Sequence, residues 1–171
     1  MAKIAVIGAG AWGTTLSILL AENQHGVTLW VYEKELISEI LQLRENKKYL
    51  PGVFLPNSIT ITNKINETKN NEVYFFVIPT QFLRSVAKKF AKVISESSIL
   101  VSASKGIEEN TLKLPSDILA EEIGNRNLCI LSGPNLSLEI AKGLPAATVV
   151  ASQNEELAKT IQGYLSSQRF R

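Results

Sequence analysis

Near its beginning the chain reads "KIAVIGAGAWGTTLSILLAEN", residues 3–23. The stretch starts as an apolar run, passes through glycines at positions 8, 10 and 13, and then shows apolar residues at helical spacing. The apolar run predicts a buried strand over residues 3–7, and the later spacing predicts a helix over residues 11–23. A strand, a glycine-rich turn and a helix therefore follow one another with no intervening segment.

Each glycine has a separate physical use if this turn binds a dinucleotide. Gly8 permits the tight turn out of the strand, Gly10 lets the backbone approach a pyrophosphate, and Gly13 lets the helix pack closely on the strand. The free N–H groups at the helix start would face the phosphates. Glu33 lies 20 residues after Gly13, where an acidic residue can bind the ribose hydroxyls of the adenosine half. The alternative is an ordinary glycine turn with a solvated Glu33.

The same stretch bears on the choice between the cofactors NAD and NADP. A carboxylate at Glu33 repels a 2′-phosphate, which favours NAD over NADP. Its neighbours act in other directions, because Tyr32 could stack on adenine and Lys34 could reach a phosphate. Both cofactors therefore stay candidates, with a weak preference for NAD.

Short apolar runs and helical patterns alternate along the rest of the chain. Strands are predicted over residues 27–32, 58–62, 72–79, 98–104, 127–132 and 146–152, and helices over residues 35–44, 80–94, 114–123, 137–142 and 155–165. This alternation predicts an α/β fold with a doubly wound, mostly parallel, Rossmann-like sheet and helices on both faces. We expect one dinucleotide-binding domain over residues 1–171, and Thr80 as the cap of the helix that begins there.

The composition argues against several other classes of protein. A net charge of +2 over 171 residues, with no cluster of Lys and Arg, does not indicate a nucleic-acid surface. With one Cys and one His, the chain has no disulfide framework, and no metal site is expected. No apolar run approaches the roughly 20 residues of a membrane span, and the start is not that of a signal peptide. We therefore expect a cytoplasmic protein.

Three further stretches follow predicted strands and so fall on the ligand-binding edge of a parallel sheet. They are "VIPTQFLRSV", "VSASKGIEEN" and "LSGPNLSLEIAKGLPAA". The second contains Lys105, the one plausible electrophilic group at this edge, although a lone lysine in a loop is more often only solvated. His25 is expected to be a solvated turn residue, and Cys129 a buried small hydrophobic residue.

In order and spacing, these stretches resemble the bacterial NAD(P)-dependent glycerol-3-phosphate dehydrogenases. The resemblance is carried by "GAGAWGT", "NKKYLPGVFLP", "VIPTQFLR", "SASKGIE" and "LSGPNLSLEIAKGLPAA". That family reduces dihydroxyacetone phosphate to sn-glycerol 3-phosphate, the backbone precursor of phospholipids. The expected partner is thus a small-molecule substrate, and the resemblance is compatible with a homodimer of a full-length protein.

The resemblance implies cofactor contacts along one cleft. Ala11 and Trp12 would touch the cofactor phosphates, Tyr32 the adenosine end, and Pro79 and Phe82 the nicotinamide side. Trp12 lies inside the glycine turn, where an aromatic residue is expected to find little core to join and so to shape the cleft.

The resemblance also implies substrate contacts. Lys105 would contact both cofactor and substrate, Gly133 and Asn135 the substrate, and Ser137 the cofactor. The family usually has Ser or Thr at position 135 and Phe-Ala at positions 136–137, so Asn135 departs from its pattern. An asparagine side chain can still hydrogen-bond a substrate oxygen.

Members of that family continue into a second, mostly helical domain that carries the main catalytic lysine and the residues that hold the substrate phosphate. This chain ends at Arg171, so we expect it to bind cofactor and to be inactive by itself. Two alternatives stay open. One is a non-catalytic dinucleotide-sensing module, and the other is a hydroxyacid or 6-phosphogluconate dehydrogenase, which shares the opening turn.

Overall fold

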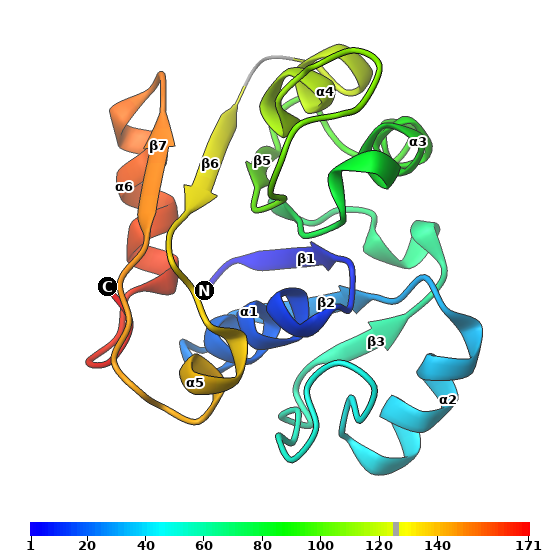
Figure 1. Ribbon diagram of the computed structural model, residues 1–171, viewed down its shortest axis with the longest axis vertical. Helices are drawn as coiled ribbons and strands as arrows, with labels where there is room; N and C mark the ends of the chain where they lie inside the picture. Colours follow the sequence, from blue (N-terminus) through cyan, green and yellow to red (C-terminus); the bar gives the residue numbers. More distant parts are fainter. Residues whose placement is uncertain (125–126) are drawn as a thin grey trace.

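A seven-stranded sheet with the strand order β3-β2-β1-β4-β5-β6-β7 forms the centre of the molecule (Figure 1). The computed structural model describes residues 1–124 and 127–171. Strands β1 to β6 are parallel, and β7 runs antiparallel to β6. The strands are β1 (Lys3–Ile7), β2 (Gly26–Trp30), β3 (Thr60–Thr62), β4 (Val73–Phe76), β5 (Ile99–Ser102), β6 (Leu128–Ser132) and β7 (Val149–Ser152).

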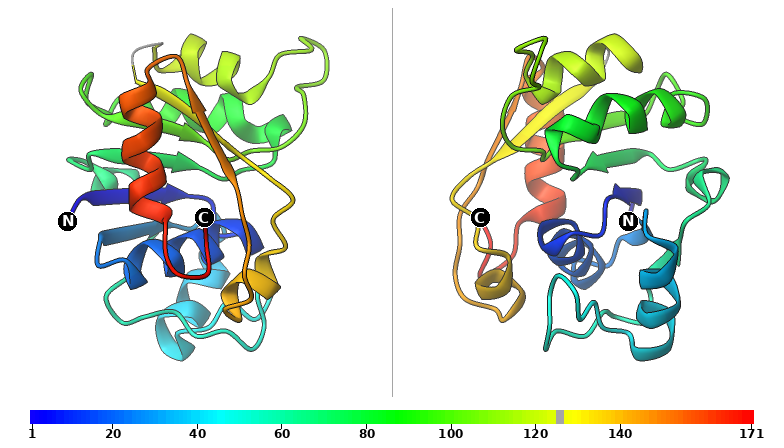
Figure 2. Two further views of the ribbon diagram at one scale, coloured as in Figure 1. Left: turned by 90° about the vertical axis from the view of Figure 1, so that its left-hand side faces the viewer. Right: turned by 45° about the vertical axis from the view of Figure 1, so that its right-hand side comes forward.

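Helices cover both faces of the sheet, which confirms the predicted fold class (Figures 1 and 2). They are α1 (Ala11–Glu22), α2 (Lys34–Leu43), α3 (Thr80–Phe90), α4 (Pro115–Glu122), α5 (Ser137–Ala141) and α6 (Glu155–Leu165), with a 3₁₀ helix η1 (Ile65–Thr68). Helices α3 and α4 pack together on one face, while the apolar sides of α1, α2 and α6 join the core on the other. No helix within the described ranges is long and apolar enough to cross a membrane.

The central strand β1 shows why the sequence stretches that form inner strands are apolar at nearly every position. Ile4 and Val6 pack into the core beneath α1 and α6, whereas Ala5 and Ile7 pack into the core beneath α3 and α4. All four side chains are fully buried. Successive side chains of a strand point to opposite faces, so a strand covered on both sides needs apolar residues at every position.

Strand β4 is shorter than the predicted run over residues 72–79. It ends at Phe76, after which the Ile78 N–H donates to the Ser104 hydroxyl at 3.2 Å and not to a neighbouring strand. Pro79 has no N–H to offer the sheet. The chain therefore turns out of the sheet at the edge where ligands bind in such folds.

Strand β7 begins at Val149, later than the predicted start at residue 146. Residues 146–148 pair with the last residues of the chain instead, through a parallel bridge between Ala146 and Phe170. The N–H of Ala146 donates to the Arg169 carbonyl at 2.8 Å, and that of Arg171 donates to the Ala146 carbonyl at 3.0 Å. This pairing brings the C-terminal residues against the body of the molecule.

Candidate functional site

The turn after β1 needs glycine at two positions for steric reasons. Gly8 has φ +113°, and a Cβ atom there would collide with the Val77 carbonyl oxygen. A Cβ atom on Gly13 would collide with the Gly8 carbonyl oxygen, so α1 lies directly on the turn. Such contacts and a positive φ are accessible to glycine alone.

Gly10 differs from these two glycines because the space beside it is empty. Apart from Gly10 itself and its two chain neighbours, no atom of the described residues lies within 4 Å of the position that its Cβ would take. Gly10 is also the N-cap residue of α1, and no side chain caps this helix end. The first N–H groups of α1 thus face an open space that a side chain would fill, which suits a pyrophosphate.

A cavity of about 360 Å³ lies at this point, between the carboxyl ends of β1 and β4. The strand order reverses here. On one side of β1 lie β2 and β3, and on its other side lie β4, β5, β6 and β7. Doubly wound sheets bind their ligands at this reversal. The cavity brings together six of the predicted cofactor residues, namely Gly8, Gly10, Tyr32, Glu33, Pro79 and Phe82. Tyr49 and Lys89, which the sequence did not indicate, also line it.

Glu33 stands at the edge of this cavity as the N-cap residue of α2, three residues beyond the end of β2 at Trp30. The Tyr49 hydroxyl donates to its Oε1 at 2.6 Å, and the Lys48 ammonium lies 3.5 Å from the same oxygen. Partial burial would raise the pKa of this carboxyl, but the bonds from Tyr49, the backbone and Lys48 outweigh it and lower the pKa. Glu33 is therefore an ionised hydrogen-bond acceptor at neutral pH.

Asn46 connects two turns of the chain, a role that the sequence did not indicate. Its side chain is fully buried in the loop after α2, and its amide donates to the Ala9 carbonyl and the Thr14 hydroxyl, both at 2.8 Å. Its Oδ1 accepts the Tyr49 N–H at 3.2 Å. Asn46 thus fixes the turn over residues 46–50 to the glycine-rich turn after β1. An asparagine in a polar stretch gives no sequence signal of such a role.

Trp12 has a different environment from the one expected. Its ring is partly buried against the core, with a centroid 6.4 Å from that of Phe170, and it does not line the cavity. The expectation that Trp12 finds little core to join is wrong, because Phe170 supplies that core from the other end of the chain. Ala11 follows Gly10 as the first residue of α1.

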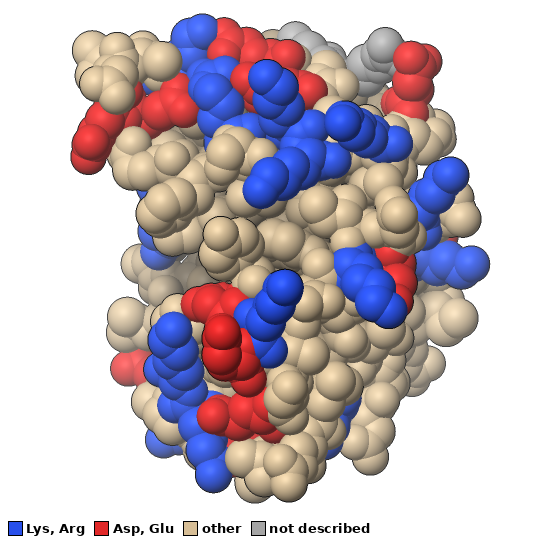
Figure 3. All heavy atoms as spheres, turned by 90° about the vertical axis from the view of Figure 1, so that its right-hand side faces the viewer, with Lys and Arg blue, Asp and Glu red and all other residues tan. Residues whose placement is uncertain are grey.

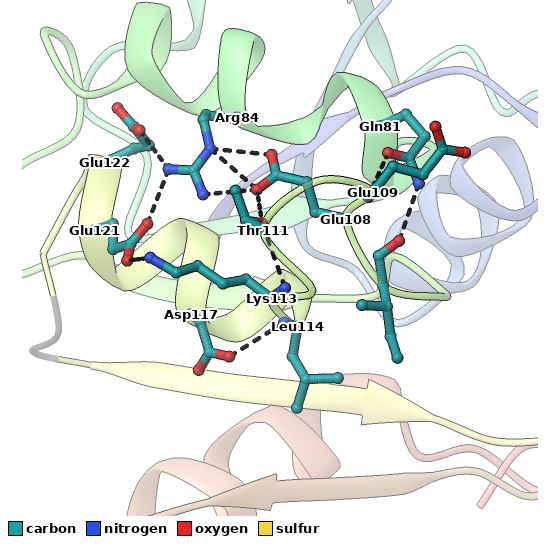
Figure 4. A network of polar contacts seen from close by, with 11 residues as sticks. Gln81, Arg84, Glu108, Glu109, Thr111, Lys113, Leu114, Asp117, Glu121 and Glu122 are labelled. Atoms are coloured by element: carbon teal, nitrogen blue, oxygen red, sulfur yellow. Dashed lines mark hydrogen bonds and ion pairs between the residues drawn. The ribbon is translucent and has the colours of Figure 1, made fainter.

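The loop that carries Lys105 is held by the first turn of α3. The Thr80 hydroxyl donates to the Lys105 carbonyl at 2.6 Å, and the Gln81 amide donates to the Ile107 carbonyl at 2.9 Å. Arg84 makes a two-pronged contact with the Glu108 carboxylate (Figure 4). The Lys105 residue is exposed at the carboxyl edge of the sheet. It does not line the cavity.

Helix α3 itself differs from the prediction in two respects. Its N-cap residue is Pro79, and Thr80 is its first helical residue, so the expected cap at Thr80 is wrong. The helix ends at Phe90 and not at residue 94, because the Val93 N–H bonds the Phe90 carbonyl at 2.9 Å in a tighter turn. The hydroxyl of Thr80 is thereby free to hold the Lys105 loop.

A charged cluster extends this contact to α4. Besides Glu108, the Arg84 guanidinium bonds Glu121 at 2.9 Å and Glu122 at 2.7 Å (Figure 4). Hydrogen bonds from Arg84 and then Thr111 lower the pKa of Glu108. The Arg84 side chain is 29% exposed, so the cluster is partly shielded from water. It fixes the 105–114 loop between α3 and α4.

The remaining predicted residues lie after β6, outside the cavity lining. A Cβ atom on Gly133 would approach the Thr148 hydroxyl to 3.1 Å. The Asn135 amide donates to that hydroxyl at 3.1 Å, while its buried Oδ1 has no hydrogen-bond partner within the described ranges. Ser137 begins α5, and its carbonyl accepts from the Thr15 hydroxyl at 3.1 Å.

These loops share one edge because the strands before them are parallel and in register. Ile7 pairs with Phe76, Phe76 with Ser102, and Ser102 with Ile130. The pairing continues past the strand ends, since the N–H of Ala103 donates to the Phe76 carbonyl at 2.9 Å. Figure 3 looks onto the side where α2 and α3 lie, and basic and acidic side chains lie close together in both its upper and its lower part.

His25 and Cys129 are the two remaining residues for which the sequence predicted an environment. His25 is half-buried, accepts the Ala2 N–H on Nδ1 at 3.2 Å and packs 4.6 Å from the Tyr164 ring, so the expectation of a solvated residue is wrong. Cys129 is fully buried in β6, as expected, and its burial raises the pKa of the thiol. Neither lines the cavity.

Known proteins resemble the chain over its whole length. The glycerol-3-phosphate dehydrogenase (NAD(P)+) of Fusobacterium nucleatum is 38% identical over 174 residues, covering 100% of this chain and 52% of that protein. The protein of the same name from Corynebacterium glutamicum is 40% identical over 174 residues, with the same coverage of 100% and 52%. The chain thus spans about half the length of the curated relatives it matches.

A solved structure and a family model agree with these relatives. The crystal structure of glycerol-3-phosphate dehydrogenase from Coxiella burnetii superposes with a TM-score of 0.94 at 29% identity, covering 99% of this chain and 52% of that one. The family described as NAD-dependent glycerol-3-phosphate dehydrogenase N-terminus matches residues 3–158. The chain therefore belongs to the family formed by the N-terminal part of the NAD-dependent glycerol-3-phosphate dehydrogenases.

Proposed function

We propose that this chain is the dinucleotide-binding part of an NAD(P)-dependent glycerol-3-phosphate dehydrogenase, which reduces dihydroxyacetone phosphate to sn-glycerol 3-phosphate. One observation carries the proposal. An open space before the uncapped start of α1, beside Gly10, adjoins a cavity bordered by the ionised Glu33. A dinucleotide places its pyrophosphate at such a helix start and the hydroxyls of its adenosine ribose on such a carboxylate.

In this proposal each lining residue has a task. The backbone from Gly8 to Ala11 holds the pyrophosphate, and Glu33 accepts the ribose hydroxyls beside Tyr32. Pro79 and Phe82 bound the nicotinamide side, where Phe82 is 62% exposed and so available for contact. The bound cofactor supplies the hydride for carbonyl reduction.

The substrate would lie beside the loops after β5 and β6. Lys105 would donate a hydrogen bond to the substrate and polarise its carbonyl, while Gly133 leaves room for it and the unpaired Oδ1 of Asn135 accepts one of its hydroxyls. Trp12 and Ser137 remain proposed neighbours of the cofactor. The main catalytic lysine and the residues that hold the substrate phosphate are proposed to belong to the half of the relatives that this chain does not match.

The wider setting is part of the same proposal. Residues 1–171 would form one dinucleotide-binding domain of a cytoplasmic enzyme, which supplies glycerol 3-phosphate for phospholipid synthesis and is a homodimer at full length. The weak preference for NAD rests on the charge of Glu33.

Cofactor binding is the first test. Calorimetric titration of this chain with NADH should show binding. Gly10→Val should raise the Kd for NADH at least about tenfold, because its side chain fills the space proposed for the pyrophosphate. Gly163→Val is the control, since Gly163 lies in α6 with open space around it. Equal affinities for both variants, or no binding by the unaltered chain, would contradict the proposal.

Catalysis is tested by joining this chain to the remaining half of the Corynebacterium glutamicum relative. The chain alone should not oxidise NADH with dihydroxyacetone phosphate, and the chimera should. Lys105→Ala in the chimera should lower kcat/KM by about 10²–10³, because one donor to the developing oxyanion is lost. A dinucleotide-sensing module would bind NADH but leave the chimera inactive.

A further inference from the structure

Two groups from one turn converge on the Glu33 carboxylate. The Tyr49 hydroxyl donates to Oε1 at 2.6 Å, and the Lys48 ammonium lies 3.5 Å from Oε1 and 4.9 Å from the Tyr49 ring centroid. The Lys48 side chain is 57% exposed and that of Glu33 31% exposed. An ion pair this open to water contributes little, so Lys48 can exchange Glu33 for a stronger anion at small cost.

The position of this turn is determined by buried contacts. Asn46 is fully buried and bonds the Ala9 carbonyl, the Thr14 hydroxyl and the Tyr49 N–H. The Leu50 N–H donates to the Asn46 carbonyl at 2.8 Å and closes the turn. The turn that carries Lys48 and Tyr49 is therefore fixed to the glycine turn, and hence to the place proposed for the pyrophosphate.

The charges at this end of the cavity have opposite consequences for the two cofactors. Glu33 accepts the ribose hydroxyls of NAD and repels the 2′-phosphate of NADP. A neighbouring ammonium offsets that repulsion and can itself form a charge-assisted bond with a phosphate. We infer that Lys48 is a specificity-determining residue, which admits the 2′-phosphate of NADP(H) beside Glu33. The inference rests on the proposed function.

Lys48 is distinguishable from the other lysines near the cavity. Lys89 lines the cavity from α3 and makes no ion pair with Glu33 in the described part of the chain. Lys47 precedes Lys48 on the same turn, is exposed, and also makes no described ion pair with Glu33. Lys47→Gln therefore removes the same charge from the same turn without removing the contact.

The experiment compares NADH and NADPH by calorimetric titration of this chain and of Lys48→Gln, Lys47→Gln and Lys89→Gln. Lys48→Gln should raise the Kd for NADPH about tenfold or more, because one bond between charged groups is lost. Its Kd for NADH should change by less than about twofold, since the exposed pair contributes little. Lys47→Gln should leave the ratio of the two Kd values unchanged.

The outcomes separate the inference from the proposed function. An unchanged ratio in Lys48→Gln, a shift in Lys89→Gln alone, or an unaltered chain that binds only NADH would overturn the role of Lys48. Binding of neither nucleotide by the unaltered chain would overturn the proposed function, and the inference with it. A loss of NADPH binding in Lys48→Gln, with NADH binding retained, supports both.

Discussion

The glycines of the turn after β1 are required for different reasons, and their variants should differ accordingly. Gly13→Ala should lower the free energy of unfolding by about 1–3 kcal/mol, because the added Cβ overlaps the backbone oxygen of Gly8. Gly10→Ala should cost only about 0.5–1 kcal/mol, through a poorer N-cap. Urea denaturation of both variants measures the difference, and equal costs would refute the packing explanation.

His25 gives a second residue-scale prediction, for pH. Partial burial and the nearby chain N-terminus lower its pKa from 6.5, against opposing contributions from the Tyr164 backbone and Glu72. Because the unfolded chain takes up this proton at higher pH than the folded chain does, the contribution of His25 to stability is fully present above about pH 6.5 and falls as the pH drops below it. Protonation also removes the acceptor that Nδ1 offers to Ala2.

The test compares the melting temperature of the chain with that of His25→Gln between about pH 8 and about pH 5. The unaltered chain should lose more stability across this interval than the variant, since only it has the titrating ring. Parallel curves would show that the ring is as hydrated in the folded state as in the unfolded state. Carboxylates elsewhere affect both proteins equally and cancel in the comparison.

At the scale of elements, apolar patterning predicted the strands because β1 and β4 are buried on both faces. Element ends were predicted less well, because they depend on partners that are distant in sequence. Strand β4 stops where Ile78 finds Ser104, and β7 starts late because Ala146 pairs with Phe170. The glycines and Glu33 were predicted from spacing alone, whereas Asn46 acts only through tertiary contacts.

Arg84 in the N-terminal half of α3 provides a prediction for this helix and its neighbouring loop. Arg84→Lys keeps the charge but loses the two-pronged contact with Glu108, which one ammonium cannot reproduce. Backbone hydrogen exchange over residues 105–113 should become faster by roughly tenfold, with little change in the strands. Lys88→Arg, the reverse exchange at an exposed position of α3, is the control and should leave this loop unchanged. Equal exchange in both variants would mean that Thr80 and Gln81 hold the loop unaided.

At the scale of the whole molecule, the strand order of the sheet separates the cavity from Lys105 and Asn135. The cavity lies between β1 and β4, while Lys105 and Asn135 follow β5 and β6 farther along the same edge. Helix α3 touches both regions, since Phe82 lines the cavity and the Thr80 hydroxyl donates to the Lys105 carbonyl. A change in the first turn of α3 should therefore affect the proposed cofactor site and the proposed substrate site together.

The two ends of the chain also meet, which gives the last prediction. Phe170 is 1% exposed, packs near Trp12 in the first turn of α1, and forms a backbone bridge with Ala146. Phe170→Ala should lower the free energy of unfolding by about 3–5 kcal/mol, the usual cost of removing a buried aromatic ring. Phe54→Ala is the matched control, because Phe54 is 69% exposed, and it should cost less than about 0.5 kcal/mol.

Denaturant unfolding of the two variants decides the point. Tryptophan fluorescence, to which Trp12 and the buried Trp30 both contribute, should shift to the red in folded Phe170→Ala, because the Trp12 indole then meets water where the Phe170 ring had packed. If Phe170→Ala and Phe54→Ala are equally stable and the emission does not move, the C-terminal residues do not support the glycine-rich turn after β1. A large loss confined to Phe170→Ala instead means that the glycine turn, at the start of the chain, is braced by its last residues.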